Sequence, residues 1–180
     1  VPRRRYSGYV TNGGTEGNMY GLYLAREAHP KGIVYFSEDA HYSIPKICRV
    51  LHLPSASVAS QPSGEMCYEA LARRMQKNRR VPAIVLANIG TTMKGAVDRI
   101  GAIRSVLRRA RVRQSYIHCD AALGGMLLPF MPGSPPFDFR AGIDSLAVSG
   151  HKFIGMPMPS GVVIALRKHI ERVRTNIEYI

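Results

Sequence analysis

Short apolar runs alternate with helical patterns along most of this chain of 180 residues. Six of the runs are short and mostly β-branched or aliphatic, as strands buried on both faces of a sheet are. We expect strands at Ile33–Phe36, Ser57–Ala59, Ala83–Ala87, Tyr116–His118, Ser145–Val148 and Gly161–Leu166.

Three stretches between these runs repeat apolar residues at helical spacing. We expect Thr15 to cap the first helix and Asp98 the last, because both side chains accept bonds from backbone amides at a helix start. The three stripes are Met19, Leu22 and Tyr23; Met66, Ala70, Leu71 and Met75; and Ile100, Ile103, Val106, Leu107 and Ala110. The alternation predicts an α/β domain with a mostly parallel sheet, whose ligands lie beyond the carboxyl ends of the strands.

Composition allows one buried core, since 46% of the residues are hydrophobic. No apolar run is long enough to span a membrane. The formal net charge is +13, and basic residues cluster at 73–80 and 104–113. Their helical spacing favours solvated helix faces. A nucleic-acid-binding module without catalysis is the alternative, although no zinc finger or RRM signature supports it.

The three cysteines, Cys48, Cys67 and Cys119, are too few and too scattered for a disulfide framework or a CxxC metal site. They favour a reduced, cytoplasmic setting and predict no metal.

The chain lacks an initiator Met, so we expect residues 1–180 to be a fragment of a longer protein.

The segment Thr11-Asn-Gly-Gly-Thr15 stands directly before the first predicted helix. Gly13 and Gly14 permit a turn without Cβ clashes, and amides at a helix start favour an anion such as phosphate. Thr15 can add a hydroxyl contact. A plain glycine turn is the alternative interpretation, and neither nucleotide-binding glycine motif is matched.

A carboxylate stands at the end of the predicted strand Tyr116–His118. Asp120 follows an apolar run, where a carboxylate can pair with a ring nitrogen cation, and the small Ala122 lets a flat ring lie close. Asp120 can instead cap the next segment. Metal ligation by His118, Cys119 and Asp120 is disfavoured, because consecutive strand residues alternate between faces.

Lys152 follows another strand, in Ser149-Gly-His-Lys152, and apolar residues come after it. We expect desolvation among them to lower its pKa and make the amine a nucleophile for a Schiff base. Ser149 and His151 add donors nearby. The alternative is an ordinary surface lysine.

His41 and the pair Thr91 and Thr92 lie in loops after two other strands. A histidine there can stack on an aromatic ring or handle a proton, although a surface histidine is more common. The threonines offer hydroxyls, or form a polar turn. Together, the phosphate cradle, the stacking histidine, the carboxylate and the lysine are what pyridoxal 5′-phosphate (PLP) requires of a protein.

The ordered motifs Asn-Gly-Gly-Thr-Glu-Gly-Asn, His-Tyr-Ser, Asn-Ile-Gly-Thr-Thr, Asp-Ala-Ala and Ser-Gly-His-Lys resemble the group II PLP-dependent amino-acid decarboxylases. The likeness runs from about Gly8 to Ile180, and is greatest to the histidine decarboxylases and the related serine decarboxylases. It implies the large domain of PLP-dependent fold type I, which is aspartate aminotransferase-like, without an N-terminal segment and a C-terminal small domain.

The resemblance also implies roles. Lys152 corresponds to the Schiff-base lysine, Asp120 to the partner of the pyridine nitrogen, and His41 to the ring-stacking histidine. The remaining implied cofactor contacts are Gly14, Thr15, Ser149 and His151 at the phosphate, Ala122 against the ring, and Thr91 or Thr92 near the phenolic oxygen.

The activity implied is decarboxylation of an L-amino acid, histidine to histamine first and serine to ethanolamine second. The partners implied are a small-molecule substrate and further copies of the chain, in a homodimer or homotetramer, with no nucleic acid and no membrane. Another PLP-dependent reaction on the same fold, such as transamination or desulfuration, remains an alternative.

Overall fold

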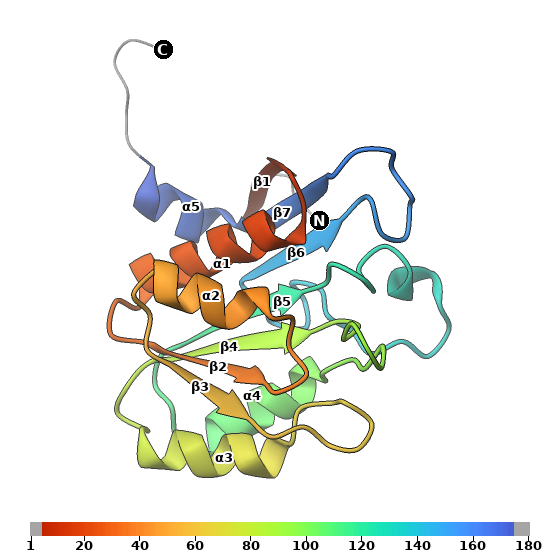
Figure 1. Cartoon of the computed structure of the whole chain (residues 1–180). Helices are drawn as coiled ribbons and strands as arrows, with labels where there is room; N and C mark the ends of the chain where they lie inside the picture. The colour runs from red at the N-terminus through yellow and green to blue at the C-terminus, as the bar shows by residue number, and fades with distance from the viewer. Residues whose placement is uncertain (1–4, 175–180) are drawn as a thin grey trace.

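The computed structural model describes residues 5–174, which form one seven-stranded sheet (Figure 1). Its strand order is β1-β7-β6-β5-β4-β2-β3. The five strands from β3 to β6 in this order are parallel, whereas β7 is antiparallel to both β6 and β1. The strands are β1 Tyr6–Thr11, β2 Ile33–Ser37, β3 Ser55–Val58, β4 Ala83–Asn88, β5 Ser115–Asp120, β6 Ser145–Ser149 and β7 Gly161–Leu166. The predicted mostly parallel α/β sheet is therefore confirmed.

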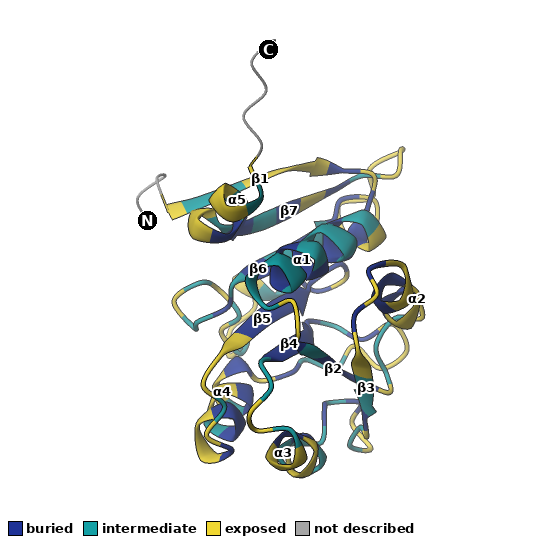
Figure 2. Cartoon of the chain, turned by 90° about the vertical axis from the view of Figure 1, so that its left-hand side faces the viewer, coloured by how far each residue is buried: buried dark blue, intermediate teal, exposed yellow. Residues whose placement is uncertain are grey.

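Helices cover both faces of the sheet, and each layer encloses its own apolar core (Figures 1 and 2). The helices are α1 Gly14–Ala28, α2 Ser43–Val50, α3 Tyr68–Lys77, α4 Ile100–Arg109 and α5 Arg167–Val173, with a short 3₁₀ turn, η2, at Leu128–Phe130. Leu22 of α1 and Ile47 of α2 pack on one face, while Leu71 of α3 and Ile103 of α4 pack on the other. Within the described residues no helix is long and apolar enough to cross a membrane.

All six predicted strands are present, with ends that differ by up to two residues, and the three predicted helices exist. The strand β1 was not predicted, because three of its six residues are exposed and no apolar alternation marks it. Helix α2 was not predicted either. Its Pro45 lies in the first turn, where proline is tolerated because the first amides of a helix have no partner within it.

Both predicted helix caps are wrong. Helix α1 begins one residue before Thr15, and its N-cap is Gly13, which has no side chain. The carboxylate of Glu16 instead accepts a bond from the Asn12 amide at 2.8 Å. Asp98 is not the cap of α4, because Arg99 occupies that position.

The buried Asp98 carboxylate ties three segments together instead. It accepts the backbone N–H of Met66 at 2.7 Å and that of Asn88 at 2.7 Å, together with the Asn88 side-chain amide at 3.2 Å. Burial raises the pKa of Asp98 to about 6, against the opposing effect of these donors. The residue is therefore a buried link between β4, α4 and the segment that leads into α3.

Candidate active site

Chain segments from five parts of the sequence meet beyond the carboxyl ends of the central strands, around a cavity of about 530 Å³. That volume lies within the usual range for small-molecule sites. The lining residues are Asn12, Gly13, Gly14, Thr15, Glu16, Asn18, Met19, His41, Asp120, Ala122, Ser149, His151, Lys152 and Pro159. Eight of the ten predicted site residues are among them.

The glycine turn sits at the start of α1 and forms one wall of the cavity. A Cβ on Gly14 would lie 2.8 Å from the Ala122 Cβ and 2.9 Å from the Ser149 Oγ, so no larger residue fits without a shift. Gly13 has φ +141°, a conformation that side chains rarely adopt. The Gly14 amide donates to the Ser149 Oγ at 3.1 Å. The wall thus combines a helix N-terminus with a hydroxyl, the setting that binds phosphate in proteins.

Asp120 ends β5 and is buried at the floor of the cavity. Its Oδ1 accepts the backbone N–H of Ala122 at 3.1 Å. Burial raises the pKa of its carboxyl, while the Ala122 amide, the Asn18 amide and the charge of Lys152 act in the opposite direction. A cation placed against this carboxylate would favour its ionised form, so the floor fits a protonated ring nitrogen.

His41 reaches the cavity from the turn between β2 and α2. Its Nδ1 accepts the backbone N–H of Ser43 at 3.3 Å and lies 2.8 Å from the Ser43 Oγ. Burial lowers the pKa of His41, and the charges of Lys152 and Lys46 also lower it, against the effect of Asp120. A neutral imidazole whose Nδ1 is engaged leaves its flat face and its Nε2 for a ligand.

Lys152 lines the cavity from the loop after β6, but its predicted apolar enclosure is wrong. The side chain is exposed, and Phe153 and Ile154 are each 54% exposed. These apolar residues lie in an open loop and are themselves exposed, so they do not enclose the amine. Beside it, the Nδ1 of His151 lies 3.0 Å from the Ser160 carbonyl and closes the loop on itself.

The structure does not bring Thr91 and Thr92 into the cavity lining. Thr91 is buried, and its hydroxyl accepts the Ala96 amide at 3.0 Å within the loop after β4. Their predicted contact with the cofactor stays a prediction. Conversely, Asn18 lines the cavity and was given no role from the sequence. Its position one helical turn after Gly14 places it on the same face of α1, and this spacing could have identified it from the sequence.

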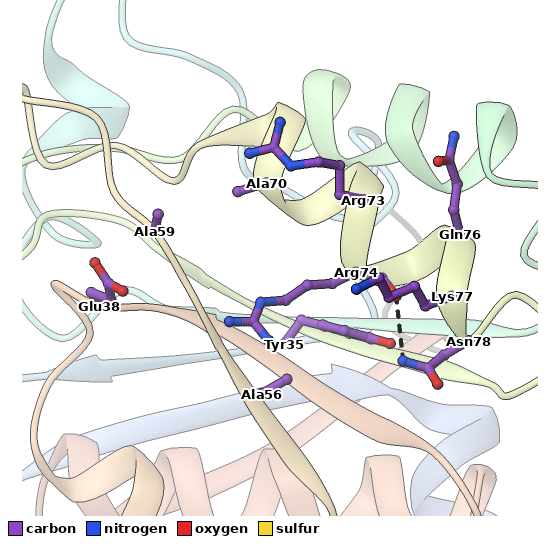
Figure 3. Close-up of a pocket in the computed structure, with 10 residues that line it drawn as sticks. All are labelled: Tyr35, Glu38, Ala56, Ala59, Ala70, Arg73, Arg74, Gln76, Lys77 and Asn78. Atoms are coloured by element: carbon purple, nitrogen blue, oxygen red, sulfur yellow. Dashed lines mark hydrogen bonds between the residues drawn. The ribbon is translucent and has the colours of Figure 1, made fainter.

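A cavity of about 770 Å³ lies elsewhere, between α3 and the edge strand β3 (Figure 3). Its lining contains Arg73, Arg74 and Lys77, which belong to one of the basic clusters of the sequence. No residue predicted for catalysis lies there. Across residues 5–174 there is also no group of three or more potential ligand side chains that could hold a metal ion.

A flat ligand with a phosphate at one end, a basic ring nitrogen and an aldehyde fits the first cavity, because each feature meets a matching group. The glycine turn suits the phosphate, the buried carboxylate suits the nitrogen, and the lysine suits the aldehyde. Fold and site together define a PLP-dependent enzyme of fold type I, the aspartate aminotransferase-like class.

Comparison with known proteins narrows the class. Residues 7–179 match the model of the pyridoxal-dependent decarboxylase conserved domain. The chain therefore belongs to the pyridoxal-dependent decarboxylase family, a family of carboxy-lyases whose cofactor is PLP.

Among curated relatives, histidine decarboxylase of Morganella morganii is 47% identical over 182 residues, which is 100% of this chain and 48% of that protein. Histidine decarboxylase of Mesorhizobium japonicum is 52% identical over 173 residues, covering 96% of this chain and 47% of that protein. The chain thus spans about half the length of these relatives.

Solved structures share the fold. L-methionine decarboxylase from Streptomyces sp. 590, in complex with 3-methylthiopropylamine, superposes with a TM-score of 0.86 at 25% identity, over 97% of this chain and 54% of that one. The Oryza sativa protein TDC, solved with PLP and tryptamine, superposes with a TM-score of 0.83 at 22% identity, over 100% of this chain and 41% of that one.

Proposed function

We propose that the whole protein decarboxylates an L-amino acid, with histidine as the first candidate substrate and serine as the second. The observation that carries this proposal is the cavity that joins Lys152, Asp120 and His41 to the glycine turn of α1. The identity of 47–52% to histidine decarboxylases over nearly the whole chain supports histidine.

The position of each residue in the cavity sets its proposed role toward the cofactor. Lys152 would hold the cofactor through its amine, and Asp120 would keep a proton on the ring nitrogen. His41 would lie against the ring, while Gly14, Thr15, Ser149 and His151 would bind the phosphate. When bound, the cofactor supplies the electron sink that accepts the electron pair left as carbon dioxide departs. Lys152 is the one lysine among the residues that line the cavity, so its amine would return a proton to the substrate carbon.

The test is to incubate the whole protein with PLP and a panel of L-amino acids, and to measure released carbon dioxide and the amine formed. We expect histamine from histidine. The variant Lys152→Ala should lose both the visible absorbance of the cofactor and the release of carbon dioxide. Lys31→Ala, which removes an exposed lysine from the turn before β2, should change neither. Retention of absorbance and activity in Lys152→Ala would falsify the proposal.

Product analysis separates the alternatives. A keto acid in place of an amine indicates transamination or desulfuration on the same fold. Affinity for nucleic acid that falls steeply with salt, without a bound chromophore, indicates a basic binding module.

We further infer that residues 1–180 are the PLP-binding large domain, and that an N-terminal segment and a C-terminal small domain complete it in the whole protein. We also propose that the protein is a homodimer or a homotetramer. The exposed apolar residues beside the cavity support this assembly, since Met156 and Met158 are 46% and 71% exposed. Sedimentation of the whole protein tests it, and a monomer that is active would contradict it.

A cytoplasmic location is the last part of the proposal. Cys48, Cys67 and Cys119 are all free, which fits a reducing compartment. Fractionation of cells that express the whole protein tests this location.

A further inference from the structure

A row of buried polar side chains leads from the protein interior to the floor of the cavity. Tyr116 and His118 lie on β5, Ser145 lies opposite His118 on β6, and Asn18 lies on α1. Each is at most 2% exposed. Buried polar groups are costly unless they are hydrogen-bonded, so the partners of each side chain in this row matter.

The hydrogen bonds in this row run in one direction. The Tyr116 hydroxyl donates to the Ser145 Oγ at 2.9 Å, and the Ser145 Oγ lies 2.7 Å from the Nδ1 of His118. The Nε2 of His118 lies 2.9 Å from the Asn18 Oδ1. An amide oxygen only accepts, so Nε2 carries the proton and Nδ1 accepts from Ser145.

Two features keep His118 in this state. Burial lowers its pKa to about 3, so the imidazole is neutral at physiological pH. The neighbouring helix residue is Gly21, where a Cβ would lie 2.3 Å from both Cε1 and Nδ1 of the ring. The glycine leaves the space that the imidazole fills, and the two hydrogen bonds fix how the ring is turned.

The row ends at the active-site carboxylate. Asn18 and Asp120 line the same cavity. Because the Asn18 Oδ1 accepts from His118, its Nδ2 is left to face Asp120, and the Asn18 amide lowers the pKa of the Asp120 carboxyl against the effect of burial. His118 and Asp120 are two residues apart on β5, so both side chains point to the α1 side of the sheet. If the amide were turned over, its oxygen would face the carboxylate and repel it.

We propose that His118 is a positioning residue of the active site, which holds the Asn18 amide in the orientation that directs an N–H group at the Asp120 carboxylate. Asp120 thereby keeps the negative charge that a protonated ring nitrogen requires. The inference rests on the proposed function, because it acts on PLP through Asp120.

Two amide substitutions separate positioning from simple packing. In His118→Gln the side-chain nitrogen reaches the place of Nε2 and still donates to Asn18. In His118→Asn the shorter amide reaches only the place of Nδ1, and the donor to Asn18 is lost. Both variants remove the ring and leave a cavity, so both lose stability.

The measurement is the dissociation constant for PLP of the whole apoprotein, titrated across pH. We expect His118→Asn to weaken PLP binding by about tenfold, the effect of losing one bond to a charged group, while His118→Gln stays close to the wild type. In His118→Asn the pKa of Asp120 should rise further, so the acid limb of the binding profile should move to higher pH. Loss of affinity in both variants in proportion to their loss of thermal stability overturns the proposal, as does wild-type affinity in both.

A second measurement does not depend on the cofactor. Nuclear magnetic resonance of the whole apoprotein with ¹⁵N-labelled histidine should show His118 neutral, with its proton on Nε2, down to about pH 5, well below the ordinary histidine pKa. A proton on Nδ1, or protonation near the ordinary pKa, overturns the proposal. A wild-type protein that binds no PLP instead refutes the proposed function, whatever the state of His118.

Discussion

The substitution Gly21→Ala tests the packing of α1 against the sheet. In an exposed helix this change is stabilising, because alanine favours the helical backbone by about 1 kcal/mol over glycine. At position 21 the added Cβ would lie 2.3 Å from two atoms of the His118 ring. The ring is completely buried and is bonded on both sides, by Asn18 and by Ser145.

Three contributions set the expected change in the free energy of unfolding for Gly21→Ala. Forcing a methyl group into a packed core costs about 2 kcal/mol. Displacement of the ring breaks its two hydrogen bonds, at about 1 kcal/mol each. The helix propensity of alanine returns about 1 kcal/mol. We therefore expect Gly21→Ala to lower the free energy of unfolding by about 3 kcal/mol.

The assay is urea unfolding of the whole apoprotein, followed by circular dichroism. The matched control is Gly101→Ala on α4, where an added Cβ meets no atom within 4 Å. This control should be unchanged or more stable by up to about 1 kcal/mol. If Gly21→Ala is as stable as Gly101→Ala, Gly21 is not required to make room for the His118 ring, and the ring is not held in place as proposed.

Three further outcomes are expected. Asp98→Ala leaves three donors without their acceptor and should cost about 3 kcal/mol or more in urea unfolding; a loss below about 1 kcal/mol would contradict the role of Asp98 as a link. The pKa of His118 falls from 6.5 to about 3 on folding, so the unfolded chain binds a proton first as the pH drops. The contribution of His118 to stability should be fully present above about pH 6.5 and be lost, by up to about 5 kcal/mol, towards pH 3; His118→Asn should show a correspondingly shallower decline. Thr91→Ala should cost about 1 kcal/mol in urea unfolding by losing the bond from Ala96; a variant as stable as the wild type would contradict this role, and a loss of PLP affinity would support the predicted contact of Thr91 with the cofactor.

Local pattern predicted the central strands β4 and β5 well because they are short and almost completely buried. Ala83–Asn88, for example, is buried at every position, so its hydrophobic run depends on no partner. The helix ends were predicted poorly, because a cap depends on where a side chain points. Asp98 has the residue type of a cap, yet its carboxylate turns inward to amides from two other segments.

For the site too, the positions of the residues were predicted better than the surroundings of their side chains. Gly14, Asp120 and Lys152 fall at strand or helix ends, where the topology of a parallel sheet gathers ligands, and the structure places all three in one cavity. The surroundings of Lys152 were predicted wrongly, since apolar neighbours in sequence do not by themselves enclose a side chain. Phe153 lies in an open loop and is 54% exposed. Whether an apolar side chain is buried depends on residues that are distant in the sequence.

Helix α1 shows why the role of Asn18 could not be predicted from the local sequence pattern. Gly17 and Gly21 each weaken the interior of the helix by about 1 kcal/mol relative to alanine, and Gly14 begins it. In the fold each faces a group on the sheet side, and a Cβ on Gly17 would lie 2.7 Å from the Ala147 Cβ. The glycines let the helix approach the sheet closely, and that approach brings Asn18 to the carboxylate on β5. A feature that is unfavourable for the helix alone thus becomes intelligible only once the sheet beneath it is known.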